Sequence, residues 1–110
     1  MQQTGELMEA FTQTVIDLLK SIPEGSVCTY GTIALMAGRP NGARQVTRII
    51  HSLSRKYDLP WHRIINAKGM ISLPKPFGYN EQKTLLQNKG VEFDEKDRID
   101  LKKYLWMGSH

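Results

Sequence analysis

Apolar residues recur every three or four positions over the first part of the chain, which is the spacing of one face of an α-helix. These positions are Leu7, Phe11, Val15, Leu18 and Ile22. The pattern predicts an amphipathic helix from about Glu6 to Ser21. The turn-forming sequence Pro23-Glu24-Gly25 follows it and is expected to end it.

Two shorter helical patterns come next along the chain. Residues 27–29 favour a strand, and a second helix is predicted to begin at Thr29 or Tyr30 and to stop at Gly38. After the turn-forming "RPNG", residues 43–56 ("ARQVTRIIHSLSRK") have the pattern of a third helix. Two short helices joined by a Gly-containing turn, with basic residues on the second, are typical of a helix-turn-helix.

The third helix is predicted to carry apolar and cationic side chains on opposite faces, since residues lie 100° apart around a helix axis. The apolar face comprises Ala43, Val46, Ile50 and Leu53. The cationic face comprises Arg44, Arg48, His51 and Arg55. Periodicity alone favours an ordinary solvated helix face. A solvated face normally mixes signs, however, and acids are scarce here, so the pattern favours a helix that faces DNA.

The second half of the chain mixes strand and helix signals. After Pro60, "RIINAKGMIS" predicts a strand, a turn and a second strand, and a hairpin after a helix-turn-helix is typical of a winged helix. "LPKPFG" is a Pro-rich loop, and "YNEQKTLLQNKG" predicts a last clear helix that ends at Gly90. Leu101, Leu105 and Trp106 in the tail are expected to pack back on the domain.

The predicted fold is therefore α+β, a winged helix-turn-helix in a single compact domain. The chain has 110 residues, which suits one domain with a modest core. We expect residues 1–107 to form this domain. Residues 108–110 resemble the remnant of an expression tag.

Charge is distributed unevenly along the sequence. Residues 26–75 contain eight Lys or Arg residues and one acid, Asp58, a net charge of +7. The rest of the chain contains seven basic and ten acidic residues, a net charge of −3. One strongly positive segment beside acidic flanks favours a polyanionic partner such as nucleic acid.

Several other classes of protein are disfavoured. No long apolar run and no charged-then-apolar leader occurs, so neither a transmembrane helix nor a signal peptide is expected. The single cysteine, Cys28, cannot form an internal disulfide and cannot hold zinc by itself. These features favour a cytoplasmic protein without a metal or other cofactor.

Three ordered motifs carry a family resemblance: "VCTYGTIALMAG", "GARQVTRII" and "PWHRIINAKG". In this order and spacing they resemble the C-terminal domain of O6-alkylguanine-DNA alkyltransferases, over roughly residues 7–93. In that family the third motif contains Pro-Cys-His-Arg, and its Cys accepts the alkyl group from a damaged guanine. Trp61 has the place of that Cys here, which is the mark of the alkyltransferase-like proteins.

Trp61 excludes the transfer reaction on chemical grounds. Alkyl transfer requires a soft, activatable nucleophile such as a Cys thiolate, whereas an indole offers no such lone pair. By resemblance, a Glu just before a Gly in the last helix orients the motif's His, but the matching residue here is Lys89. We therefore expect His62 to be a hydrogen-bonded structural residue and Cys28 to be a small core residue. The sequence predicts a protein that is not an enzyme.

The resemblance implies a DNA-binding apparatus that enters the minor groove. Tyr30 matches the family's Tyr beside the rotated phosphate, and Arg44 matches the Arg that fills the gap left by an extruded base. Apart from the resemblance, a helix-capping Tyr30 and a solvated Arg44 are the alternatives. The small Ala43 lets the helix approach the groove floor. The expected DNA-contacting residues are Tyr30, Ala43, Arg44, Thr47 and Arg48.

A lesion pocket is also implied. Its expected lining residues are Tyr30, Pro60, Trp61, Lys75 and Pro76. Trp61 would supply a broad apolar wall that does not react. The "KPFG" loop replaces a Tyr-Ser-Gly-Gly pattern that closes over the base in the enzymes. We expect Lys75 to place a cation over the purine and Phe77 to fill the core.

Two functions from different classes fit the sequence. The first is a monomeric, non-enzymatic sensor that binds O6-alkylguanine in double-stranded DNA and hands the lesion to nucleotide-excision repair proteins. The second is a winged-helix transcription regulator that reads a sequence in the major groove with Arg44, Arg48 and His51. A third, an active alkyltransferase, is disfavoured by Trp61.

Overall fold

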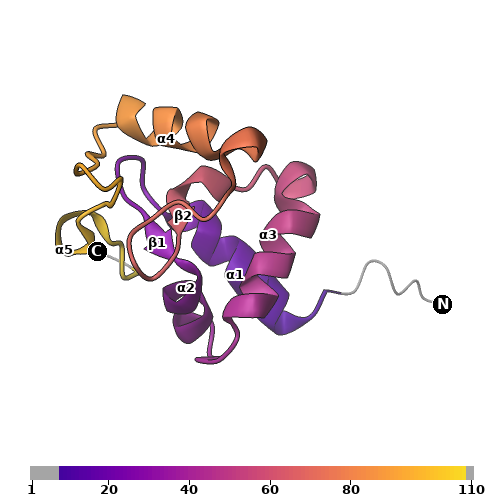
Figure 1. Ribbon diagram of the computed structural model, residues 1–110. Coiled ribbons are helices and arrows are strands. Elements are labelled where there is room, and N and C mark those ends of the chain that lie inside the picture. The colour runs from indigo at the N-terminus through magenta and orange to yellow at the C-terminus, as the bar shows by residue number, and fades with distance from the viewer. Residues whose placement is uncertain (1–7, 109–110) are drawn as a thin grey trace.

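The computed structural model describes residues 8–108 (Figure 1). The predicted start of the first helix at Glu6 and Leu7 lies outside the described residues, as do residues 109–110 of the expected tag remnant. None of the helices within residues 8–108 combines the length and the apolarity needed to cross a membrane.

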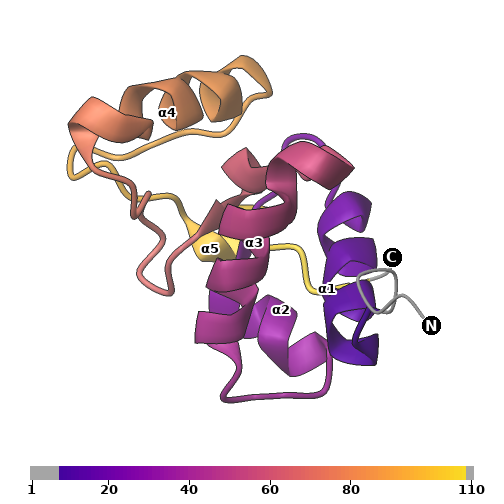
Figure 2. The same ribbon diagram turned by 90° about the vertical axis from the view of Figure 1, so that its right-hand side faces the viewer.

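Helices predominate, and three of them form one group. The elements in chain order are α1 (Ala10–Ser21), β1 (Cys28–Thr29), α2 (Tyr30–Met36), α3 (Ala43–Tyr57), the 3-10 turn η2 (Trp61–Arg63), β2 (Ile64–Ile65), the 3-10 turn η3 (Lys75–Phe77), α4 (Tyr79–Asn88) and α5 (Leu101–Tyr104). Figure 2 shows α1, α2 and α3 grouped together, with α4 set apart from them. The four predicted helices are present, but α1 begins at Ala10 and not near Glu6, and α2 and α4 end two residues before the predicted Gly38 and Gly90.

The two strands pair in parallel at the centre of the molecule (Figure 1). Cys28 is opposite Ile64, and Thr29 is opposite Ile65. The C-terminal segment extends this pairing, because the Trp106 amide donates to the Val27 carbonyl at 2.8 Å. β1 leads directly into α2, and β2 follows directly after Trp61-His62-Arg63. The pairing of the two strands therefore brings the start of α2 close to this turn.

Most of the buried side chains form two clusters. One lies between α1, α2 and α3 and includes Phe11, Ile33 and Val46. The other lies beneath α4 and includes Leu86 and Ile99. The predicted packing of the tail is confirmed, since Leu105 and Trp106 contact the first cluster and Leu101 contacts the second.

The helix-turn-helix is formed by α2 and α3. The Thr29 side chain caps α2 by accepting a hydrogen bond from the Thr32 amide at 3.0 Å, as polar N-cap residues do. Gly38 follows α2 at φ +94°, a left-handed conformation that glycine adopts without a Cβ clash. A Cβ on Gly42, just before α3, would lie 3.0 Å from the Arg39 carbonyl oxygen. The α+β helix-turn-helix class predicted from the sequence is confirmed.

The predicted hairpin after Pro60 is wrong in its second strand. β2 pairs with β1, and residues 66–70 form a compact turn in which Asn66 Oδ1 accepts bonds from the Lys68 and Met70 amides. Gly69 in this turn lies so close to the tail that a Cβ would be 2.6 Å from the Ile99 carbonyl oxygen. The C-terminal segment therefore packs against the turn at Gly69. The segment expected to form the wing is a loop and not a hairpin.

Candidate nucleic-acid interface

The outward face of α3 is cationic. Arg44, Arg48, His51 and Arg55 are all exposed on this helix. Val46, Ile49 and Ile50 are buried on its inner side. The predicted separation of apolar and cationic faces is therefore confirmed, with Ile49 as an additional core residue.

Some cations of the positive segment are neutralised within the domain, whereas those on α3 are not. Arg39 forms a 2.9 Å ion pair with Glu9 and lies over the Phe11 ring, 4.3 Å from its centroid. By contrast, Arg44 and Arg48 form no ion pair with any residue in the range 8–108. Their charge is available to a polyanion.

Ala43 is the first residue of α3, and Thr47 lies one turn further along the helix. The Thr47 hydroxyl donates a 3.0 Å hydrogen bond to the Ala43 carbonyl, so this hydroxyl is already engaged within the helix. Both residues are half-buried. Their contact with DNA stays a prediction.

A cavity of about 180 Å³ opens beside α3. Its lining residues are Tyr30, Ile50, His51, Ser54, Trp61, Leu73 and Gln82. Tyr30 is the first residue of α2. Its hydroxyl lies 3.3 Å from the hydroxyl of Ser72, in the loop after β2, and this hydrogen bond links the phenol ring to that loop. The structure thus brings Tyr30 and Trp61 together, and it adds five lining residues that the sequence did not indicate.

Trp61 is presented to this cavity by a tight turn at Pro60. With φ −79° and ψ 65°, Pro60 has the geometry of an inverse γ-turn, closed by a 2.8 Å bond from the Trp61 amide to the Leu59 carbonyl. Pro60 itself lines an adjoining hollow that it shares with Trp61 and His62. Pro60 was expected to line the lesion pocket, but it is not among the lining residues of the 180 Å³ cavity.

The loop before α4 contributes Leu73 to the lining of that cavity. Lys75 and Pro76 do not line it, and the Lys75 ammonium is 5.7 Å from the centroid of the Tyr79 ring. Their role in lesion binding stays a prediction. The expectation that Phe77 fills the core is wrong, because its side chain is 75% exposed on the short 3-10 turn η3.

Gln82 anchors the segment that contains Trp61 and was missed at the sequence level. It is 2% exposed, and its Nε2 donates to the carbonyls of His62 at 3.0 Å and Ile64 at 2.8 Å. Its position four residues before the buried Leu86 was the available signal, since residues i and i+4 share a helix face. Gln82 therefore ties α4 to the Trp-His-Arg turn.

His62 differs from its expected role. No residue within 8–108 forms a hydrogen bond with its ring, so the expectation of a hydrogen-bonded imidazole is wrong. The ring instead meets Trp61 edge-on, with centroids 5.8 Å apart. Burial, followed by the adjacent charge of Arg63, lowers the pKa of His62 from its ordinary value, although Glu24 opposes this. Lys89 forms an ion pair with Glu24, with 3.4 Å between Nζ and Oε1.

Cys28 lies in the core, as the sequence predicted. Its side chain is fully buried, and its thiol donates to the Trp106 carbonyl at 3.3 Å. Burial raises the pKa of Cys28 to about 11. The thiolate that would accept an alkyl group is therefore scarce at neutral pH.

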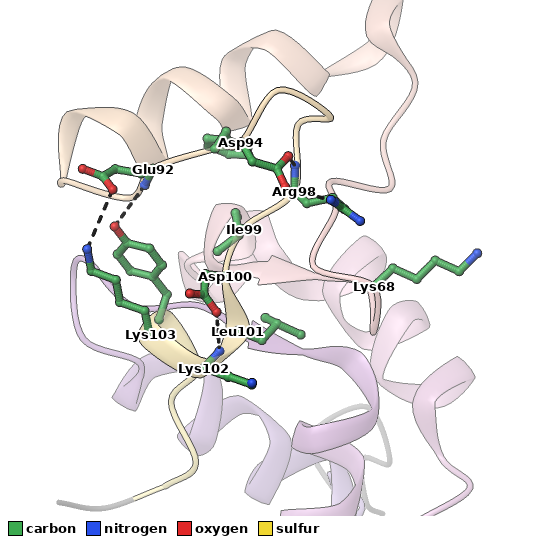
Figure 3. Close-up of a pocket in the computed structure, with 11 residues that line it drawn as sticks. Lys68, Glu92, Asp94, Arg98, Ile99, Asp100, Leu101, Lys102 and Lys103 are labelled. Atoms are coloured by element: carbon green, nitrogen blue, oxygen red, sulfur yellow. Dashed lines mark hydrogen bonds and ion pairs between the residues drawn. The ribbon is translucent and has the colours of Figure 1, made fainter.

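A larger hollow, of about 710 Å³, lies elsewhere on the described surface (Figure 3). It lies along the C-terminal segment and shares no residue with the cavity beside α3. Its charges largely compensate one another: Asp94 pairs with Arg98 at 3.1 Å, and Glu92 pairs with Lys103 at 3.7 Å (Figure 3). Both pairs join residues within the C-terminal segment.

The fold and the surface of α3 define the class of the protein as a helix-turn-helix DNA-binding domain. Residues 10–91 match the family described as 6-O-methylguanine DNA methyltransferase, DNA binding domain. The chain belongs to this family, and its relatives identify it as an alkyltransferase-like protein.

Two curated relatives and one solved structure support this assignment. The chain is 41% identical over 105 residues to the DNA base-flipping protein of Escherichia coli, covering 96% of this chain and 81% of the relative. It is 38% identical over 104 residues to Alkyltransferase-like protein 1 of Schizosaccharomyces pombe, covering 90% and 96%. The crystal structure of S. pombe Atl1 in complex with damaged DNA containing O6-carboxymethylguanine matches with a TM-score of 0.76 and 37% identity, over 91% of this chain and 97% of that one.

Proposed function

We propose that this protein is a non-enzymatic sensor of O6-alkylguanine in double-stranded DNA. It approaches the minor groove with α3 and flips the damaged nucleotide into the cavity between Tyr30 and Trp61. It leaves the alkyl group on the base. The protein acts as a monomer and passes the lesion to nucleotide-excision repair proteins.

One observation carries the proposal: a cavity of about 180 Å³ opens directly beside the cationic face of α3. Liquid water occupies about 30 Å³ per molecule, so the cavity has room for more than a bound water or two. A protein that contacts only the groove has no need of such a space, whereas a base removed from the stack needs a pocket. The relatives named for base flipping and crystallised with O6-carboxymethylguanine DNA support this assignment.

The side chains around the cavity fit recognition without chemistry. Trp61 supplies an aromatic wall on which a purine can stack and to which an alkyl group cannot be transferred. Cys28, the only thiol in the sequence, is buried in the core. The lowered pKa of His62 favours its neutral form.

Arg44 and Tyr30 supply the energy for flipping. Extrusion of a nucleotide costs a few kcal/mol of stacking and pairing, and least for a damaged base. The exposed Arg44 guanidinium fills the vacated place in the stack, and Tyr30 at the mouth of the cavity stacks near the extruded base. The remaining cations of α3 hold the phosphates.

The experiment that tests the proposal compares equilibrium binding to matched duplexes with and without a single O6-methylguanine. Fluorescence anisotropy should show tighter binding to the damaged duplex in several sequence contexts. A sequence-specific regulator would instead prefer one sequence and ignore the lesion. Equal affinity for damaged and undamaged duplexes in every context would refute the sensor.

A further inference from the structure

Gln82 has a fixed orientation at the wall of the cavity. Both partners of its Nε2 are backbone carbonyls, of His62 and Ile64, and a carbonyl only accepts hydrogen bonds. The amide nitrogen must therefore face these two groups, and the amide oxygen must face elsewhere. The side chain is 2% exposed, so the oxygen is removed from bulk solvent.

The Oε1 atom of Gln82 is an acceptor without a donor. No residue in the described part of the chain donates a hydrogen bond to it, although Gln82 lines the cavity. Buried polar atoms are nearly always paired in native proteins, and an unpaired one calls for an explanation. The Tyr30 hydroxyl also lines the cavity, but its hydrogen bond in this structure is with the Ser72 hydroxyl, at 3.3 Å, and not with Gln82.

The chemistry of the lesion indicates which donor would fit. Alkylation of guanine at O6 removes the proton from N1, and N9 carries the sugar. N1, N3, N7 and O6 then only accept hydrogen bonds, so the exocyclic 2-amine is the one donor of the base. An acceptor in the pocket can pair with that group alone.

We propose that Gln82 Oε1 accepts a hydrogen bond from the exocyclic 2-amine of the flipped base. The cavity then selects purines that carry an amine at C2. This inference rests on the proposed function and refines it. Since undamaged guanine has the same amine, Gln82 reads the identity of the base, and the ease of extrusion distinguishes the lesion. Adenine, which has its amine at C6, and the pyrimidines do not offer this group.

The test measures affinity for two duplexes that differ by one amine. One contains O6-methylguanine, and the other contains O6-methylhypoxanthine, which lacks only the 2-amine. Wild-type protein should bind the first about five- to tenfold more tightly, as expected for one hydrogen bond. Gln82→Lys keeps donors for the carbonyls of His62 and Ile64 but has no acceptor, so its ratio should fall to within about twofold. Gln87→Lys, an exposed change on the same helix, should keep the wild-type ratio.

The comparison separates recognition from structure. Deleting the amine also alters pairing in the free duplex, but that effect is the same for every protein variant and cancels between them. A merely structural role of Gln82 would weaken binding to both duplexes equally and leave the ratio unchanged. Such a result would overturn the inference.

A measurement on the unmodified protein is independent of how the variants fold. The side-chain carbonyl ¹³C resonance of Gln82 should shift on binding the O6-methylguanine duplex and should shift less with O6-methylhypoxanthine. Equal shifts, or equal wild-type affinities for the two duplexes, would overturn the inference while leaving the sensor intact. Failure of the wild type to prefer O6-methylguanine over guanine would overturn both.

Discussion

Arg44 and Arg48 are one helical turn apart on the exposed face of α3, yet we expect them to act at different stages. Arg44 matters once a base has left the stack, because its guanidinium fills the gap. Arg44→Ala should therefore weaken binding to O6-methylguanine duplex by about 1–3 kcal/mol and weaken binding to undamaged duplex by less. Parallel anisotropy titrations would measure both losses.

Arg48 is the matched control for that change. A phosphate contact serves damaged and undamaged DNA alike, so Arg48→Ala should lower the two affinities by the same factor. If Arg44→Ala also lowered both equally, Arg44 would be one more surface cation and the proposed gap-filling role would be wrong.

Trp61→Cys restores the Pro-Cys-His-Arg motif but not an alkyltransferase. In this structure Lys89 forms a 3.4 Å ion pair with Glu24, and no residue of the described chain orients the His62 ring through a hydrogen bond. We expect little or no methyl transfer, because the new thiol lacks an activating partner. Intact-protein mass spectrometry after incubation with methylated DNA would detect it, and rapid stoichiometric transfer would show that His62 alone suffices.

At the level of elements, the helices could be predicted from the sequence, whereas the pairing of the strands could not. A hairpin was predicted after Pro60, but β2 pairs with β1. The apolar spacing of α3 marks its buried face by local sequence alone, so Val46 and Ile50 were assigned correctly. Strand pairing depends on partners distant in the chain. Ile64 pairs with Cys28, and the tail at Ile99 covers the turn at Gly69, which no local pattern indicates.

The residues of the candidate site also fall into those that the sequence identified and those that only the fold brings together. Tyr30 and Trp61 were found through motifs, whereas Gln82 and Leu73 reach the cavity only through the packing of α4 and the loop before it. Phe77 was misplaced because its hydrophobicity predicts burial, whereas the turn η3 leaves its side chain 75% exposed. The sequence therefore identified the residues of the family motifs more readily than the other residues that line the cavity.

The anchoring of α4 to the C-terminal segment should depend on pH through Asp97. This carboxylate accepts a 2.7 Å hydrogen bond from the Tyr79 hydroxyl and pairs with Lys83 at 2.9 Å. These two bonds hold the pKa of Asp97 below its ordinary value. A lowered folded-state pKa stabilises the protein above the unfolded pKa, near 4, and this stabilisation is lost as pH falls through the folded value.

Asp97→Asn should therefore lower the Tm at pH 7, and its difference from wild type should shrink as the solution is acidified below about pH 4. Asn also tolerates the left-handed backbone at this position, φ +60°. Glu95→Gln, an exposed change that removes the same charge, is the control and should leave the Tm nearly unchanged. A difference that grows on acidification would contradict the assignment of Asp97.

For the molecule as a whole, the unpaired cations of α3 should make binding strongly dependent on salt. If Arg48 and Arg55 each neutralise one phosphate, the logarithm of the affinity for undamaged duplex should fall with a slope of about −1.8 in log salt. Titrations at several salt concentrations would measure the slope, and Arg48→Ala should reduce its magnitude by about 0.9. A flat salt dependence would show that α3 is not the DNA-binding face.

Flipping without transfer is tested most directly by measuring unstacking and protein mass in one sample. A duplex carrying 2-aminopurine next to a single O6-methylguanine is titrated with the protein, and the same mixture is then analysed by mass spectrometry. We predict a saturable rise in 2-aminopurine fluorescence, as the neighbouring base leaves the stack, with the protein mass unchanged. Binding without any rise in fluorescence, or a stoichiometric gain of one methylene in the protein, would contradict the account.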